Sequence, residues 1–447
     1  MHEAEQMTRS PKQWPDAGAL SAFTCAVALA CSDHGSSAKG FVDATVGSTP
    51  LTHPCDLPGS IQFTSRGVVV VPGGPSGADL SYLHLPQGFC VHPYGVIANV
   101  RQMRFAPGGE LFVSSPSRGT TSGGLNGHAA IVLMPDDNHD GTADAILTFL
   151  SDLPSTQGLL FANDRLYYQD STRIMSMPYQ LGDRVPRAPA TAMANITIFQ
   201  ATEHWPKTLD ISDDGTIYVG NGGDQDEVCD PTRPFRGGIL ELDGSEGGTP
   251  VAKGLRNPID VRCARGNDRC FALELGLDHS ASEGGREKLI PIRQGDDWGF
   301  PCCATQNVPF EGLDEAEAAV CADVAPDADT FLIGDTPFGI EFEQGRWPAP
   351  WKKEAFIAMH GAAGGDGRPW AGARIVAIAM DPTTGLPLPS ADALGADTGA
   401  MTDFATGWDD GTLEHGRPTA IAFSDDGRLF VGDDQKGVIF WIAAMTQ

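Results

Sequence analysis

Basic residues are scarce in this sequence, and so are the motifs of several common protein classes. Its 447 residues hold 30 Lys and Arg against 58 Asp and Glu, which gives a formal net charge of −28. A surface this acidic repels nucleic acid and anionic membranes, so we expect no nucleic-acid partner. None of the ten cysteines forms a Cys-x-x-Cys pair, which argues against a zinc ribbon or a thioredoxin-like site.

Long helices and membrane-spanning runs are also missing. No segment has the periodicity of a long amphipathic helix, which argues against a two-domain α/β protein. The apolar stretch Ala19–Ala30 follows Arg9 and Lys12 and is too short to span a bilayer, but it suits the core of a signal peptide. It ends at Cys31 in a sequence that resembles a bacterial lipoprotein cleavage box.

The N-terminal segment therefore predicts where in the cell the protein is found. We expect residues 1–31 to be a signal peptide or lipoprotein signal and residues 32–60 to form a flexible tether and the start of the fold. The protein is expected to be exported to the periplasm or the cell surface. Membrane attachment is expected only through a lipid on Cys31.

Glycine and proline are abundant, with 54 and 33 residues, and they separate a repeated strand–turn–strand pattern. Three segments show the pattern clearly: Phe105–Val113, Ile211–Val219 and Phe423–Val431. Three weaker copies lie at Phe161–Tyr168, Cys263–Leu273 and Trp351–Ala358. Six copies at spacings of roughly 50 to 90 residues are typical of propeller blades. We therefore predict an all-β fold, a six-bladed β-propeller with antiparallel four-stranded blades, over residues 61–447.

The cysteines point to an oxidising compartment, because they are scattered and even in number. Cys263 and Cys270 flank the tip of an expected hairpin, so a disulfide between them is geometrically reasonable. The other pairings cannot be read from spacing alone.

Four segments place a histidine or an arginine at the end of an expected strand: His204, Arg256, His360 and Arg417. A histidine can act as a general base near neutral pH, and an arginine can grip an anion through two hydrogen bonds. Taken singly, each is more simply a structural histidine or half of a surface ion pair. Delivered by different blades to one channel, the four would suit a small, planar, polyanionic ligand.

In order along the chain, these segments and their neighbours resemble the soluble aldose and sorbosone dehydrogenases, which use pyrroloquinoline quinone. The resemblance covers roughly residues 80 to 445, and Gly-Leu-Arg-Asn-Pro is its most specific motif. The matching stretches are Val100–Met103, the His204 segment, Gly254–Pro258, Trp298–Pro301, His360–Gly361 and Gly416–Pro418.

This resemblance implies a quinoprotein dehydrogenase that oxidises an aldose sugar or a sorbosone-like aldehyde and passes electrons to an external acceptor. His204 would take the hydroxyl proton while a hydride passes to the quinone. A calcium ion beside the quinone would bind the backbone carbonyls of Gly276 and Leu277. The cofactor-binding residues would be Arg256, Asn257, His360, Arg368 and Arg417, and the substrate-binding residues Gln102 and Glu203.

Three positions depart from the family pattern. Lys207 stands where the family often has arginine, and Glu203 stands where relatives carry a shorter acid. After His360 the family often continues with Ser-Trp-Asn-Arg, whereas here Arg368 follows a glycine-rich stretch and is expected to substitute.

A separate acidic motif, Asp136–Asp144, alternates oxygen-bearing side chains around a glycine. It resembles a calcium loop that lacks the distal glutamate of an EF-hand, with Asp136, Asn138, Asp140 and Asp144 as ligands. The alternative is an acidic hairpin turn, because Asp, Asn and Gly favour turns in any case.

Two other functions remain open for such a propeller. One is a calcium-dependent lactonase, which would need carboxylates around one metal in the channel. The other is a non-catalytic exported propeller that binds a partner or a glycan, which would need neither His204 nor a cluster of cations.

Overall fold

The computed structural model describes most of the chain from residue 53 onward. The described residues are 53–74, 77–116, 128–196, 204–223, 229, 237–277, 286–310, 312–325, 329–361, 372–389, 401–411 and 413–446. The expected signal, Cys31, Glu203 and Arg368 lie outside them, as does most of the expected tether. No helix in these ranges is both long and apolar enough to cross a membrane.

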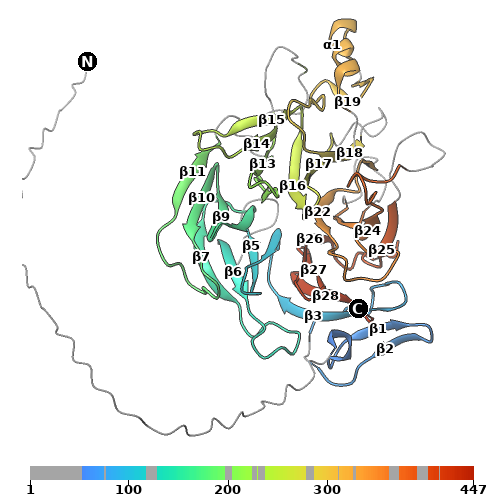
Figure 1. The fold of residues 1–447 in the computed structure, drawn as a ribbon. Coiled ribbons are helices and arrows are strands. Elements are labelled where there is room, and N and C mark those ends of the chain that lie inside the picture. The colour runs from blue at the N-terminus through green and yellow to red at the C-terminus, as the bar shows by residue number, and fades with distance from the viewer. Residues whose placement is uncertain are drawn as a thin grey trace, which may run out of the picture. The chain divides into compact units, whose positions relative to one another are not determined.

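The described strands form six antiparallel blades, so the predicted six-bladed propeller is confirmed (Figure 1). Blades 1 to 3 each contain four strands that are consecutive in the chain. Their strands are β4 (Gln102–Phe105), β5 (Leu111–Ser115), β6 (Ala129–Met134), β7 (Leu147–Leu153), β8 (Leu159–Ala162), β9 (Arg165–Asp170), β10 (Arg173–Pro178), β11 (Thr191–Asn195), β12 (Leu209–Ile211), β13 (Ile217–Asn221), β14 (Gly238–Glu241) and β15 (Thr249–Lys253).

Blades 4 and 5 also have four strands, but blade 4 contains an insertion before its last strand. The insertion holds the hairpin β19 (Cys303–Thr305) and β20 (Val308–Pro309) and the short helix α1 (Glu315–Ala319). The blade strands are β16 (Asn257–Ala264), β17 (Arg269–Leu275), β18 (Arg286–Pro291), β21 (Asp329–Leu332), β22 (Pro337–Phe342), β23 (Ala355–Met359), β24 (Arg374–Ile378) and β25 (Met401–Ala405).

Blade 6 closes the ring by joining the two ends of the fold. Its inner strands β26 (Pro418–Phe423), β27 (Leu429–Asp433) and β28 (Val438–Ala444) are C-terminal, and β28 pairs with the N-terminal strand β3 (Phe89–Val96). Figure 1 shows the red β28 beside the blue β3. The hairpin β1 (Ile61–Thr64) and β2 (Gly67–Val70) then extends this blade to six strands, an addition to the expected four. Strand β1 covers the edge that β3 would otherwise expose.

The sequence repeats correspond to the blades one for one. Five of the six copies span the turn between the first and second strands of a blade, and Trp351–Ala358 covers only the second strand of blade 5. The first strands β4, β8, β12, β16, β22 and β26 contact one another in that order around the ring, and β26 returns to β4. Each blade lies between two neighbours, so a strand such as β6 is buried along its whole length.

Four disulfides lie in the described part of the chain. The predicted bridge between Cys263 and Cys270 is confirmed, with Cα atoms 3.9 Å apart on paired positions of β16 and β17. The sequence left the other three open: Cys55–Cys90, Cys229–Cys302 and Cys303–Cys321. Two of these anchor the insertion of blade 4. Four disulfides fit a protein that folds in an oxidising compartment.

Candidate functional site at one mouth of the channel

Charged side chains of the innermost strands meet across the channel. Asp260 of β16 accepts hydrogen bonds from Gln102 Nε2 at 3.0 Å and from the Ile340 backbone at 3.1 Å, and Arg104 Nη2 lies 3.8 Å from it. Asp260 therefore joins blades 1, 4 and 5. Burial raises the pKa of Asp260 to about 6, although Arg104 opposes the shift.

A network of buried ion pairs lies deeper in the channel, further along the same strands. Arg262 of β16 pairs with Asp210 of β12, 3.4 Å away, and with Glu341 of β22. Burial lowers the pKa of Arg262, but the two carboxylates outweigh it, and the net shift is upward. The mouth of the channel lies where the inner strands begin. These ion pairs lie deeper and link β16 to the neighbouring strands β12 and β22.

The structure places the predicted site residues at the end of the blades where the inner strands begin. His204 precedes β12, Arg256 precedes β16, and Arg417 precedes β26. Each second strand runs antiparallel to the first, so the residues that follow it lie at this end too. His360 therefore joins the group, as do Gly276 and Leu277.

His204 and Arg256 come together through the backbone of Gly223. The Gly223 N–H donates to the Arg256 carbonyl at 2.6 Å, and the Gly223 carbonyl accepts from His204 Nδ1 at 3.0 Å. Gly222 must be a glycine, because a Cβ there would lie 2.3 Å from the Cβ of His204. A carbonyl can only accept, so in the neutral ring Nδ1 carries the proton and Nε2 has the lone pair. The arrangement sets His204 up to act as a base through Nε2.

A pocket beside Arg256 gathers positive charge. The backbone N–H of Arg256 donates to Glu274 Oε1 at 2.7 Å, and Lys288 Nζ lies 3.0 Å from Glu274 Oε2. Three cationic side chains and one carboxylate thus line a pocket in a protein of net charge −28. The lining residues are Arg256, Glu274, Gly276, Leu277, Arg286, Lys288, Phe300, Cys303, Ala304 and Phe310. Cationic side chains placed in this way can bind an anionic group of a ligand.

Asn257 is the first residue of β16, directly after Arg256. Its Oδ1 is buried and accepts no hydrogen bond from the part of the chain that the structure describes. A buried acceptor without a donor costs free energy, so a ligand donor or a cation at this position would be favourable.

His360 and Arg417 belong to a second group, centred on Asp434, where blades 5, 6 and 1 meet. Asp434 Oδ1 lies 3.0 Å from His360 Nε2, and Asp434 Oδ2 lies 3.1 Å from Arg101 Nη2. Burial alone would raise the pKa of Asp434, but the hydrogen bond and charge of His360, together with Arg101, hold it below its usual value.

Both predicted residues of this second group have partners within the protein. His360 Nδ1 lies 3.1 Å from the Gly361 carbonyl, so both of its ring nitrogens are engaged, and Arg417 Nε lies 2.5 Å from Glu414 Oε1. These contacts favour a role for His360 and Arg417 in holding a ligand and balancing its charge over a role as a general base.

Gln102, predicted to bind substrate, forms part of the channel wall. Its Oε1 accepts from the Leu159 backbone at 2.6 Å while its Nε2 donates to Asp260. Its amide therefore ties blade 2 to blades 1 and 4 just below the mouth.

Sequence reasoning missed several polar residues of the site. The missed residues are Arg101, Glu274, Arg286, Lys288 and Asp434, and Lys207 was noted only as a departure from the family pattern. A signal existed for two of them: Asp434 follows the strand of the sixth repeat, and Lys207 lies three residues after His204. The Glu274–Lys288 pair depends on the register of β17 against β18 and has no local sequence signal.

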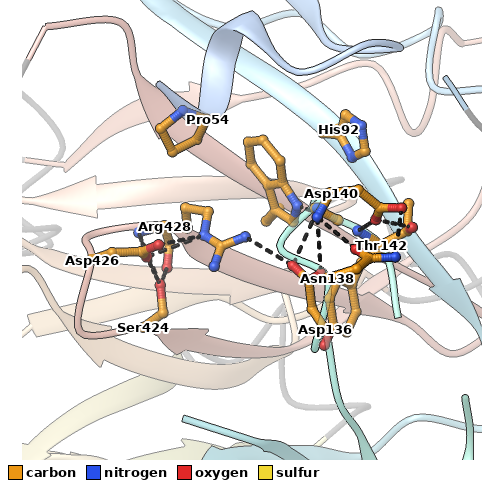
Figure 2. A network of polar contacts seen from close by, with 12 residues as sticks. Pro54, His92, Asp136, Asn138, Asp140, Thr142, Ser424, Asp426 and Arg428 are labelled. Carbon is orange, nitrogen blue, oxygen red and sulfur yellow. Dashed lines mark hydrogen bonds and ion pairs between the residues drawn. The ribbon is translucent and has the colours of Figure 1, made fainter. Parts of the chain in front are cut away.

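The acidic loop Asp136–Asp144 lies between β6 and β7 of blade 1. Figure 2 shows Asp136, Asn138 and Asp140 of this loop, with Arg428 facing Asp136. Its carboxylates accept from the loop itself: Asp136 takes the Gly141 N–H at 3.2 Å, and Asn138 Nδ2 donates to Asp144 Oδ1 at 2.9 Å. Trp441 of blade 6 donates to the Gly141 carbonyl at 2.8 Å. Among the described residues, no group of three or more His, Cys, Asp or Glu side chains is arranged to hold a metal. The predicted calcium ligands of this loop, including Asp140, stay a prediction.

Fold and site together define a class: a six-bladed propeller with a histidine and a cationic pocket at the start of its inner strands. Comparison with known proteins is consistent with that class. The family model described as TrAA12-like matches residues 292–445, and a domain of unknown function, DUF7133, matches residues 79–258. No curated protein matches the chain.

Solved structures share the fold at low identity. The holo pyranose dehydrogenase PQQ domain from Coprinopsis cinerea is 16% identical with a TM-score of 0.66, over 83% of this chain and 99% of that one. The calcium structure of the Trichoderma reesei family AA12 enzyme is 18% identical with a TM-score of 0.65, over 83% and 99%. The apo soluble aldose sugar dehydrogenase from Escherichia coli is 12% identical with a TM-score of 0.56, over 80% and 99%. The resemblance seen in the sequence is thus confirmed, and at these identities it establishes the fold.

Proposed function

We propose that this protein is an oxidoreductase that oxidises a hydroxyl group of a sugar, with pyrroloquinoline quinone at the channel mouth. The observation that carries the proposal is the pairing of His204 with Arg256 through Gly223, beside a pocket lined by three cations. The similarity to the pyranose dehydrogenase PQQ domain and to the aldose sugar dehydrogenase supports it.

The residues present fit this cofactor chemically. The quinone carries carboxylates, which arginine binds through paired hydrogen bonds, and three cationic side chains line the pocket. Arg256 and Asn257 would hold it on one side, and His360, Arg417 and Arg368 are proposed for the other. When bound, the quinone supplies a two-electron acceptor for the substrate's hydride.

His204 would act on the substrate. With its proton fixed on Nδ1 by the Gly223 carbonyl, Nε2 can accept the proton of the hydroxyl group that is oxidised. His204 is 4% exposed as a residue, so the base would work in a site from which most water is excluded. Gln102 and Glu203 are proposed to position the sugar.

Calcium is proposed as the second cofactor, with the backbone carbonyls of Gly276 and Leu277 as ligands. Both residues follow β17 at the channel mouth, and calcium prefers oxygen ligands of this kind. The carboxylates of the quinone would offset the charge of the nearby cations. The calcium structure of the Trichoderma reesei enzyme supports the proposal. The acidic loop with Asp136, Asn138, Asp140 and Asp144 is proposed as a separate, structural calcium site.

The natural setting follows from the disulfides and the N-terminal stretch. We propose an exported protein, periplasmic or at the cell surface, with Cys31 as the position of any lipid anchor. Electrons would leave to an external acceptor. An aldose is favoured over a sorbosone-like aldehyde, because two of the similar structures are named as sugar dehydrogenases.

Reconstitution tests the proposal directly. The purified protein would be incubated with pyrroloquinoline quinone and calcium, binding measured by isothermal titration calorimetry, and dye reduction followed across a panel of sugars and aldehydes. We expect saturable quinone binding and sugar-dependent dye reduction that His204→Ala abolishes. A wild-type protein that never binds the quinone would instead favour a propeller that binds a partner or a glycan.

A further inference from the structure

Lys207 is a buried cation three residues after the proposed base His204. Its residue is 3% exposed and lies in the segment that leads from His204 into β12. Lys207 Nζ donates to Asn221 Oδ1 at 2.8 Å, and its backbone N–H donates to Gln169 Oε1 at 3.0 Å. Burial lowers the pKa of Lys207 to about 8. Within the described residues, no carboxylate pairs with this ammonium group.

Three other cations in the interior of the propeller have acidic partners. Lys288 Nζ lies 3.0 Å from Glu274, Arg262 lies between Asp210 and Glu341, and Arg104 faces Asp260. A buried charge without a counter-charge destabilises a fold, and a neutral side chain of similar volume would remove that cost. Among the described residues, Lys207 therefore stands out as a buried cation whose presence packing does not account for.

The hydrogen bond of Lys207 leads to the point where the site is assembled. Asn221 ends β13, and Gly222 and Gly223 follow it directly. Gly223 then contacts both His204 Nδ1 and the Arg256 carbonyl. Two glycines in a row leave this turn with little conformational restraint of its own. The hydrogen bond from Lys207 to Asn221 restrains the residue that directly precedes this turn.

We infer that Lys207 is a positioning residue for the proposed oxidation: through Asn221 it holds the turn whose Gly223 orients His204 and Arg256. The inference rests on the proposed function for its catalytic consequence. It also makes a claim about the protein without any cofactor, namely that Lys207 keeps the His204 ring in one orientation and one tautomer.

The test uses Lys207→Met, Asn221→Leu and the double variant in full-length protein. We expect Lys207→Met to lower kcat by about tenfold or more with KM for the sugar nearly unchanged, since small displacements of a catalytic group are costly. The melting temperature of the cofactor-free variant should equal or exceed that of wild type. The matched control is Lys288→Met, which removes the ammonium group paired with the buried Glu274 and should lower the melting temperature.

Coupling between the two positions decides whether Lys207 acts through Asn221. If it does, the double variant loses no more kcat than either single variant. If the two losses multiply, or if Lys207→Met keeps wild-type kcat, the inference is wrong. If Lys207→Met lowers kcat and the melting temperature together, Lys207 has only a structural role, and the inference is also wrong.

A measurement without cofactor separates this inference from the proposed function. Imidazole ¹⁵N–¹H spectra, with the His204 signal assigned from a His204→Gln variant, report the tautomer. Wild type should show a single Nδ1–H form, and Lys207→Met should broaden or split it. If wild type fails to bind the quinone but shows this change, the proposed function fails and the positioning role stands. If wild type oxidises sugars and the variant's spectrum is unchanged, the positioning role fails alone.

Discussion

The buried ammonium of Lys207 should make the stability of the protein depend on pH in an unusual direction. Burial lowers its pKa from 10.5 to about 8 in the folded state. Below pH 8 the group is protonated both folded and unfolded, and the full cost of burying the charge is present. Between pH 8 and 10.5 only the unfolded chain holds the proton, so folding stability rises with pH over this window.

The size of the effect follows from the pKa difference. At about 1.4 kcal/mol for each pKa unit, the shift amounts to roughly 3 kcal/mol when the window has been crossed. Urea unfolding of wild type and Lys207→Met, with the disulfides intact, would be compared at pH 7, 8, 9 and 10. The difference between the two proteins cancels every other titrating group. We expect Lys207→Met to be the more stable at pH 7 and its advantage to shrink above pH 8. A difference that stays constant with pH would refute the reasoning.

Three further predictions concern the site and its frame. His204→Ala should keep quinone affinity while turnover falls by roughly 10²–10⁴-fold, the usual contribution of a general base; calorimetry and dye reduction measure the two, and full activity in the variant would contradict the role. Arg256→Ala should mainly weaken quinone binding, and excess cofactor should partly restore its activity. An unchanged quinone affinity would argue against a contact between Arg256 and the quinone. Replacing Cys263 and Cys270 together by serine should lower the free energy of unfolding by about 2 kcal/mol, the chain-entropy value for so short a loop. An unchanged urea midpoint would mean that the hairpin alone supplies the restraint.

The sequence by itself determined the blade plan, because each inner hairpin is local. The turn between β12 and β13 and the turn between β26 and β27 are built from neighbouring Ser, Asp and Gly residues, so the signal survives in short windows. The bridge between Cys263 and Cys270 was predictable for the same reason, since both cysteines flank one hairpin. The strand ends carrying His204, Arg256 and Arg417 then followed from the repeat.

Only the tertiary structure decided what depends on contacts between distant segments. The pairing of β28 with β3, the bridge between Cys229 and Cys302, and the Glu274–Lys288 pair each join residues whose partners have no local signature. The same holds for Lys207: its residue type is visible in the sequence, but its burial, with no carboxylate partner among the residues that the structure describes, is not. The physical reason is that local patterns specify hairpins, whereas the environment of a side chain at the channel mouth is set by how neighbouring blades pack around the ring.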